Sequence, residues 1–131
     1  MRIYLDSAPV IYLVEQVAPF HQRLISRLAP PETVLLTSEL TRLECRVKPL
    51  RLNDQTLLAD YDEYFQRGFE QVVELTRKVI DQATWLRAHY QFKTPDALQL
   101  ASALTLQCDV FLTNDYHLAR CQEIVVESLI P

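Results

Sequence analysis

Glycine is almost absent from this 131-residue sequence, which contains only Gly68. A loop that cradles phosphate with successive backbone amides needs several glycines, so a nucleotide-binding loop of that type is excluded. No tract rich in glycine and serine divides the chain into domains. Because 49% of the residues are hydrophobic and 23% are charged, we expect one globular domain over residues 1–131.

Cysteine and histidine are also scarce. The three cysteines, Cys45, Cys108 and Cys121, lie far apart and form no Cys-x-x-Cys pair, so neither a disulfide framework nor a zinc site is expected. The three histidines lie far apart in the sequence, and no Ser-His-Asp arrangement can be identified. No apolar run approaches the roughly 20 residues of a membrane helix, and the beginning of the chain does not resemble a signal peptide. We therefore expect a cytoplasmic protein with no membrane partner.

The net charge is −4, which argues against a surface devoted as a whole to nucleic acid. Basic residues nevertheless gather in one place. Arg42, Arg46, Lys48 and Arg51 fall within ten positions, and the only acidic residue between them is Glu44.

Strand and helix signals alternate along the chain. Short apolar stretches predict strands at 2–5, 33–37, 69–75, 109–113 and 124–126. Helical spacing of apolar residues predicts helices over 10–15, 20–28, 38–49, 53–66 and 76–90, another from residue 94, and a helical turn through residue 118. This alternation indicates an α/β domain, a mainly parallel sheet flanked by helices in an α/β/α sandwich.

The helix that starts at Thr94 has the strongest start signal. Thr94 is suited to cap it, Pro95 suits the first helical position, and Asp96 falls in the first turn, where the helix dipole favours an anion. The residues that follow are apolar or small on nearly every side, so we expect a buried helix. A carboxylate at the mouth of a buried helix requires a partner.

Three further acids also lie next to predicted apolar strands or helices. Asp6 and Asp115 each follow a predicted strand, at the edge of a parallel sheet where ligands bind, and Glu44 lies beside the apolar stripe of a predicted helix. Taken singly, Asp6 and Asp115 suit turns or helix caps, Asp96 suits a first turn, and Glu44 suits a solvated face or an ion pair with Lys48. The joint pattern favours a shared site.

Carboxylates brought together repel one another, so such a site must take up protons or a cation. Hard divalent ions prefer oxygen ligands, and no histidine or cysteine cluster offers softer ones. Mg²⁺ or Mn²⁺ is therefore the expected occupant, and a metal of this kind indicates a phosphate-containing substrate.

Four motifs in order resemble those of PIN-domain nucleases, and the size resembles the VapC-type toxins of type II toxin–antitoxin systems. The motifs are Leu5-Asp6-Ser7 followed by Val10-Ile11-Tyr12-Leu13, Thr37-Ser38-Glu39-Leu40-Thr41-Arg42-Leu43-Glu44, Thr94-Pro95-Asp96-Ala97-Leu98 with Ala101 and Ala103, and Leu112-Thr113-Asn114-Asp115. Together they span nearly the whole chain.

The resemblance implies an acidic catalytic and metal site, with hydrogen-bonding residues in support. The acids are Asp6, Glu44, Asp96 and Asp115, and the supporting residues are Thr113, Ser7 and Asn114. Glu39 is the rival for the second acid, although Glu44 fits the spacing from Ser38 and Thr41. The family often has a histidine at the position of Gln99, and we infer nothing from that difference.

The resemblance further implies an Mg²⁺- or Mn²⁺-dependent endoribonuclease whose bound water attacks the phosphodiester of RNA. Lys48 would bind the RNA backbone, together with Arg42, Arg46 or Arg51. Alternatively, these residues form a basic helix face that is merely exposed to solvent. A small antitoxin bound in the groove near the acids and a homodimer are the implied protein partners. The unbroken apolar run 11–14 is consistent with such a contact, although core burial explains most of it.

Two other functions remain open from the residues alone. A metal-dependent phosphatase or phosphotransfer domain would use Asp6, but haloacid-dehalogenase enzymes require an acid two residues later, where this chain has Ala8. A catalytically inactive PIN-like binding domain is the second alternative, and the four acids speak against it.

Overall fold

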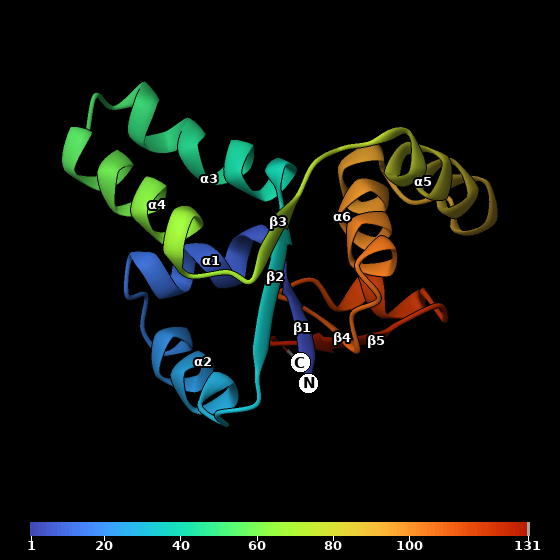
Figure 1. Cartoon of the computed structure of the whole chain (residues 1–131), viewed down its shortest axis with the longest axis horizontal. Coiled ribbons are helices and arrows are strands. Elements are labelled where there is room, and N and C mark those ends of the chain that lie inside the picture. Colours follow the sequence, from blue (N-terminus) through green and yellow to red (C-terminus); the bar gives the residue numbers. More distant parts are fainter. Residues whose placement is uncertain (131) are drawn as a thin grey trace.

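Parallel strands form the central sheet of the computed structural model, which describes residues 1–130 (Figure 1). The strands within this range are β1 (Arg2–Leu5), β2 (Val34–Ser38), β3 (Gln71–Val73), β4 (Val110–Thr113) and β5 (Val125–Ser128), in the order β3-β2-β1-β4-β5. The direction of winding reverses between β1 and β4. In open parallel sheets, ligands bind beyond the carboxyl ends of the strands at such a reversal.

Helices cover both faces of the sheet, as Figure 1 shows. One face carries α1 (Ser7–Val14), α2 (Phe20–Leu28), α3 (Glu39–Arg51) and α4 (Gln55–Arg67), and the other carries α5 (Arg77–Tyr90) and α6 (Thr94–Thr105). A short 3-10 helix, η1 (Tyr116–Arg120), links β4 to β5. The predicted α/β/α sandwich is confirmed. Within residues 1–130, no helix is both long and apolar enough to span a membrane.

The hydrophobic core has two parts, one on each face of the sheet. Along β1, Tyr4 points into the part beneath α5 and α6, whereas Ile3 and Leu5 point into the part beneath α1 to α4. All three side chains are fully buried, and the Tyr4 ring stacks on Phe111 of β4 with the ring centroids 5.3 Å apart. Burial on both faces explains why the central strands are apolar without alternation.

The start of α6 differs in detail from the prediction. Lys93 occupies the capping position, no side chain caps the helix, and Thr94 is already its first helical residue. The prediction that Thr94 caps the helix is therefore wrong, and Pro95 lies in the second position instead of the first. Asp96 does lie in the first turn, and the helix is buried as expected.

Two other local predictions are wrong. We expected the third helix to stop near Pro49, but α3 continues to Arg51, and the amide of Leu52 bonds to the Lys48 carbonyl at 3.0 Å. Proline costs this helix one hydrogen bond, and burial of the Pro49 ring accompanies its continuation. Ile80 of α5, which the spacing places inward, is exposed.

Candidate active site

Two of the predicted acids lie at the carboxyl edge of the sheet, on the two strands that flank the reversal. Asp6 follows β1 and Asp115 follows β4 by two residues. The Thr113 hydroxyl donates to Asp6 Oδ2 at 2.7 Å, and the backbone N–H of Ser7 donates to Asp6 Oδ1 at 2.8 Å. The amide of Asp115 in turn donates to Thr113 Oγ1 at 3.1 Å. Thr113 thus links the two acids and fixes the orientation of Asp6.

Glu44 reaches the same edge from α3. The Ser7 hydroxyl donates to Glu44 Oε1 at 2.6 Å, and the side-chain amide of Gln99 donates to the same oxygen at 2.8 Å. Ser7 therefore connects the two acids, since its amide bonds to Asp6 and its hydroxyl to Glu44. The Glu44 Oε2 atom accepts no hydrogen bond from residues 1–130, which leaves it open for a ligand.

Gln99 is a residue of the site to which the sequence analysis assigned no role. Its side chain is only 2% exposed, and its Oε1 accepts hydrogen bonds from the Tyr4 hydroxyl at 2.5 Å and the Thr41 hydroxyl at 3.0 Å. These two donors fix the orientation of the amide, so its N–H groups must face Ser7 and Glu44. A polar residue three positions after Asp96, in an otherwise apolar helix, was the available signal.

The fourth acid, Asp96, comes from the first turn of α6. Burial raises its pKa, the charges of Asp115 and Glu44 raise it further, and Lys93 opposes them. Burial likewise raises the pKa of Asp6 to about 6, with smaller contributions from Glu44 and Asp96 and opposition from its hydrogen bonds. The four predicted acids therefore share one electrostatic environment, to which α6 does bring its amino terminus.

The donor set suits a hard cation. Within residues 1–130, no three Asp, Glu, His or Cys side chains lie close enough to enclose a metal ion as they stand. The four carboxylates nevertheless offer only oxygen, the preference of Mg²⁺ and Mn²⁺, and their mutual repulsion would be relieved by positive charge. The residues present thus fit such an ion chemically.

Two residues predicted in or near the site make no hydrogen bond to the four acids within residues 1–130. Asn114 donates from Nδ2 to the Tyr12 hydroxyl at 2.9 Å, so it ties the end of β4 to α1 and makes no hydrogen bond to the acids. Glu39, the rival second acid, faces Arg42 at 3.6 Å on the surface of α3.

Most cations of the basic cluster on α3 form ion pairs with acids of this chain. Arg46 pairs with Asp62 of α4 at 2.8 Å, and Lys48 pairs with Glu15 at 2.7 Å. Arg51, at the end of α3, is exposed. The sequence cluster is therefore a helix face whose cations mostly have partners already.

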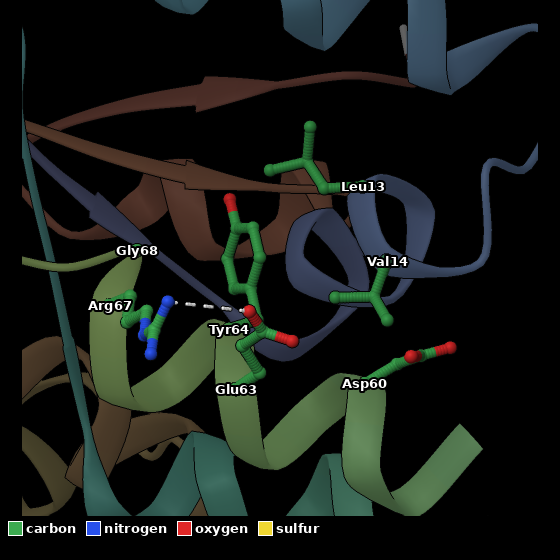
Figure 2. A pocket seen from close by; sticks show the side chains of 7 residues that line it. All are labelled: Leu13, Val14, Asp60, Glu63, Tyr64, Arg67 and Gly68. Atoms are coloured by element: carbon green, nitrogen blue, oxygen red, sulfur yellow. Dashed lines mark ion pairs between the residues drawn. The ribbon is translucent and has the colours of Figure 1, made fainter. Parts of the chain in front are cut away.

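A separate hollow lies between α1 and α4, away from the four acids. Figure 2 shows Leu13 and Val14 of α1 facing Asp60 and Glu63 of α4 across it. Arg67 lies 3.8 Å from Glu63 at one side. The hollow thus combines an apolar wall with an acidic rim.

The fold agrees with comparison against known proteins. A family model of the PIN domain matches residues 3–124, and the chain belongs to this family. A comparison with curated protein sequences gives no match.

Several solved structures share the fold. The chain is similar to a structure of VapBC2 from Rickettsia felis bound to a promoter DNA fragment, with a TM-score of 0.78, 14% identity and 98% of each chain covered. It is similar to VapBC-1 from nontypeable Haemophilus influenzae, with a TM-score of 0.74, 17% identity and 98% of each chain covered. The sarcin-ricin loop cleaving toxin VapC20 of Mycobacterium tuberculosis matches with a TM-score of 0.65 and 18% identity, over 83% of this chain and 86% of that one.

The raised pKa of Asp6 gives a prediction for metal-free stability. Between about pH 4, where an unfolded aspartate titrates, and about pH 6, the folded protein binds more protons than the unfolded chain, so the free energy of unfolding falls as pH rises. At pH 7.5 in EDTA, Asp6→Asn should raise this free energy by about 1–3 kcal/mol, and near pH 4 the gain should vanish.

Denaturant unfolding at the two pH values measures this difference. Asp81→Asn is the control, because this acid is exposed on α5 and should show no such gain. A loss of stability in Asp6→Asn at pH 7.5 would contradict the argument.

The hydrogen bonds of Gln99 give a second prediction. Gln99→Leu leaves the buried Thr41 hydroxyl without its acceptor and removes one of the two hydrogen bonds to Glu44 Oε1, so the free energy of unfolding should fall by about 1–3 kcal/mol. Gln66→Leu makes the same change at an exposed position of α4 and should alter stability by less than about 0.5 kcal/mol. Equal stability of the two variants, measured by urea unfolding, would show that the network contributes nothing.

Proposed function

We propose that this protein is a metal-dependent endoribonuclease and the toxin of a toxin–antitoxin pair. The observation that carries the proposal is that four acids, which follow β1 and β4 or belong to α3 and α6, interact at the reversal of strand order, where Ser7, Gln99 and Thr113 hydrogen-bond two of them. Membership of the PIN domain family supports it. The similar folds of toxin–antitoxin proteins, one of them named as an RNA-loop cleaving toxin, support it further.

The four acids would act as ligands of a divalent metal ion. Asp6, Asp96 and Asp115 would hold Mg²⁺ or Mn²⁺, and Glu44 would bind it directly or through water. When bound, such an ion lowers the pKa of a water molecule and offsets the charge that develops on the phosphate oxygens. Hydrolysis of an RNA phosphodiester is the reaction that this chemistry serves.

The chain's own contribution is to keep these oxygens in place. Both oxygens of Asp6 accept a hydrogen bond, so its carboxylate cannot rotate freely. Both hydrogen bonds to Glu44 end on Oε1, so Oε2 accepts none from residues 1–130. The Asp96 carboxylate accepts no hydrogen bond from residues 1–130, so it is the one most available to a ligand. These positions need little reorganisation when a phosphate arrives.

A second copy of this chain is the proposed partner at α3. Leu43, Val47 and Leu50 recur at helical spacing and are 58%, 47% and 55% exposed, with Leu75 beside them. Charges of both signs flank this face, as a self-complementary contact around a two-fold axis requires. The apolar run 11–14 of α1 gives less support than the sequence indicated, because it packs partly buried against the core.

A small antitoxin is the other proposed protein partner, at a surface other than the groove near the acids that the resemblance implies. The hollow of Figure 2 combines apolar side chains of α1 with Asp60 and Glu63 on α4. These features favour a segment that carries apolar anchors and basic residues.

The catalytic proposal is tested at Asp96. Asp96→Asn should lower Mg²⁺- or Mn²⁺-dependent cleavage of a fluorescent single-stranded RNA by about 100-fold or more, because a ligand of the ion loses its charge. Asp81→Asn, at an exposed position of α5, should cleave like the wild type. Undiminished cleavage by Asp96→Asn, or full wild-type cleavage in EDTA, would overturn the assignment.

The dimer proposal is tested at Val47. A charge buried in an apolar contact is costly, so Val47→Glu should convert a dimer into a monomer in size-exclusion chromatography with light scattering. Ile25→Glu is the matched control, since Ile25 on α2 is also 47% exposed. A wild type that is monomeric at all concentrations, or a Val47→Glu dimer, would contradict the proposal.

A further inference from the structure

A cleft with two cations opens directly beside the acids. It is lined by Gln91, Phe92, Lys93, Asp96, Asp115, His117, Leu118 and Arg120. We call it the Lys93–Arg120 cleft. Asp96 and Asp115 belong both to its wall and to the acidic site, so a ligand that enters the cleft also reaches that site.

Arg120 is held in position across this cleft. Its Nε donates to the His117 carbonyl at 3.2 Å, its Nη1 donates to the Tyr90 carbonyl at 3.3 Å, and its guanidinium carbon lies 4.7 Å from the centre of the Phe92 ring. These contacts orient the guanidinium without neutralising it, because carbonyls and rings carry no net charge.

The two cations of the cleft have no ion-pair partner within residues 1–130. The ion pairs in this range involve Arg27, Arg42, Arg46, Lys48 and Arg67. Lys93 is exposed at the start of α6, three residues before Asp96. Lys93 and Arg120 thus offer unpaired positive charge next to the acids, whereas three cations of the α3 cluster already face carboxylates.

An exposed aromatic surface adjoins the same wall. Tyr116 directly follows Asp115 and is 53% exposed, and its ring lies against the ring of His117 with centroids 4.2 Å apart. Single-stranded nucleic acids bind where cations follow the backbone and aromatic rings stack on bases. Both features occur here within one short segment after β4.

We propose that single-stranded RNA runs from the acidic site through the Lys93–Arg120 cleft, with a backbone phosphate bound by Lys93 and Arg120 and a neighbouring base stacked on Tyr116. This inference rests on the proposed ribonuclease function and adds the path of the strand. An acidic peptide would meet the same cations, but it has no use for the exposed ring beside the acids.

Binding of a labelled single-stranded oligoribonucleotide, measured by fluorescence anisotropy, tests the path. The Glu44→Gln variant in Mg²⁺ is the background, so that cleavage is suppressed. Lys93→Gln and Arg120→Gln should each weaken binding about 3- to 10-fold and lower the slope of log Kd against log salt by about 0.7. Tyr116→Ala should weaken binding about 5-fold or more, and Tyr116→Phe should restore it, because the ring and not the hydroxyl stacks.

Two controls separate the cleft from general effects. Lys78→Gln removes an exposed charge at the far end of α5 and should leave Kd and the salt slope unchanged. Arg120→Lys tests whether Arg120→Gln acts only by disturbing the packing on Phe92. This variant keeps the positive charge and should retain most of the salt slope.

The outcomes distinguish the two proposals. If the wild type cleaves no RNA, the ribonuclease function fails. If the wild type cleaves RNA but the variants at Lys93, Arg120 and Tyr116 bind like their parent, only the path is wrong. Loss of salt slope in Arg46→Gln and Lys48→Gln instead would place the RNA on α3 and overturn the path. Equal binding of polyglutamate, in competition with RNA, would make the cleft a site for acidic peptides and overturn it too.

Discussion

The burial of carboxylates beside one another at the carboxyl edge of the sheet is the constraint on which this structure depends. Asp6 and Asp96 both have raised pKa values, because each is withdrawn from water and faces other acids. Neutral hydrogen-bond donors oppose the rise at Asp6 without cancelling its charge, and the cation Lys93 opposes the rise at Asp96. Negative charge that persists at this site lowers the stability of the folded protein and raises the affinity of the site for a cation.

The donors that hold this site come from the core. Tyr4 is buried beneath α6, stacks on Phe111 and bonds to Gln99, which bonds to Glu44. The position of a carboxylate on α3 is therefore set by a side chain of α6 and by a ring of the central strand. Such a chain of packed, hydrogen-bonded groups is rigid, and rigidity is what a ligand site needs to avoid reorganisation on binding.

The remaining surfaces are divided among different elements. The acids and the Lys93–Arg120 cleft lie at one edge of the sheet, the exposed apolar face belongs to α3, and the hollow with the acidic rim lies between α1 and α4. The three proposed partners, RNA, a second copy and an antitoxin, thus have separate proposed surfaces. Negative net charge is compatible with this division, because unpaired cations are needed only along the path of the nucleic acid.

Much of the fold could be predicted from the sequence, because the signals that determine it lie within a few neighbouring residues. Strands, helices and their order follow from apolar spacing and turn residues within a few positions, and Asp6 and Asp115 are identified by the strands that precede them. What the sequence did not determine depends on side chains that lie far apart along the chain. The bond between Gln99 and Glu44 joins residues 55 positions apart, and that between Lys48 and Glu15 joins residues 33 apart. Only the packing of α1, α3 and α6 against the sheet decided which polar groups found partners and which stayed free, because that choice is made by distances between elements and not by spacing within one.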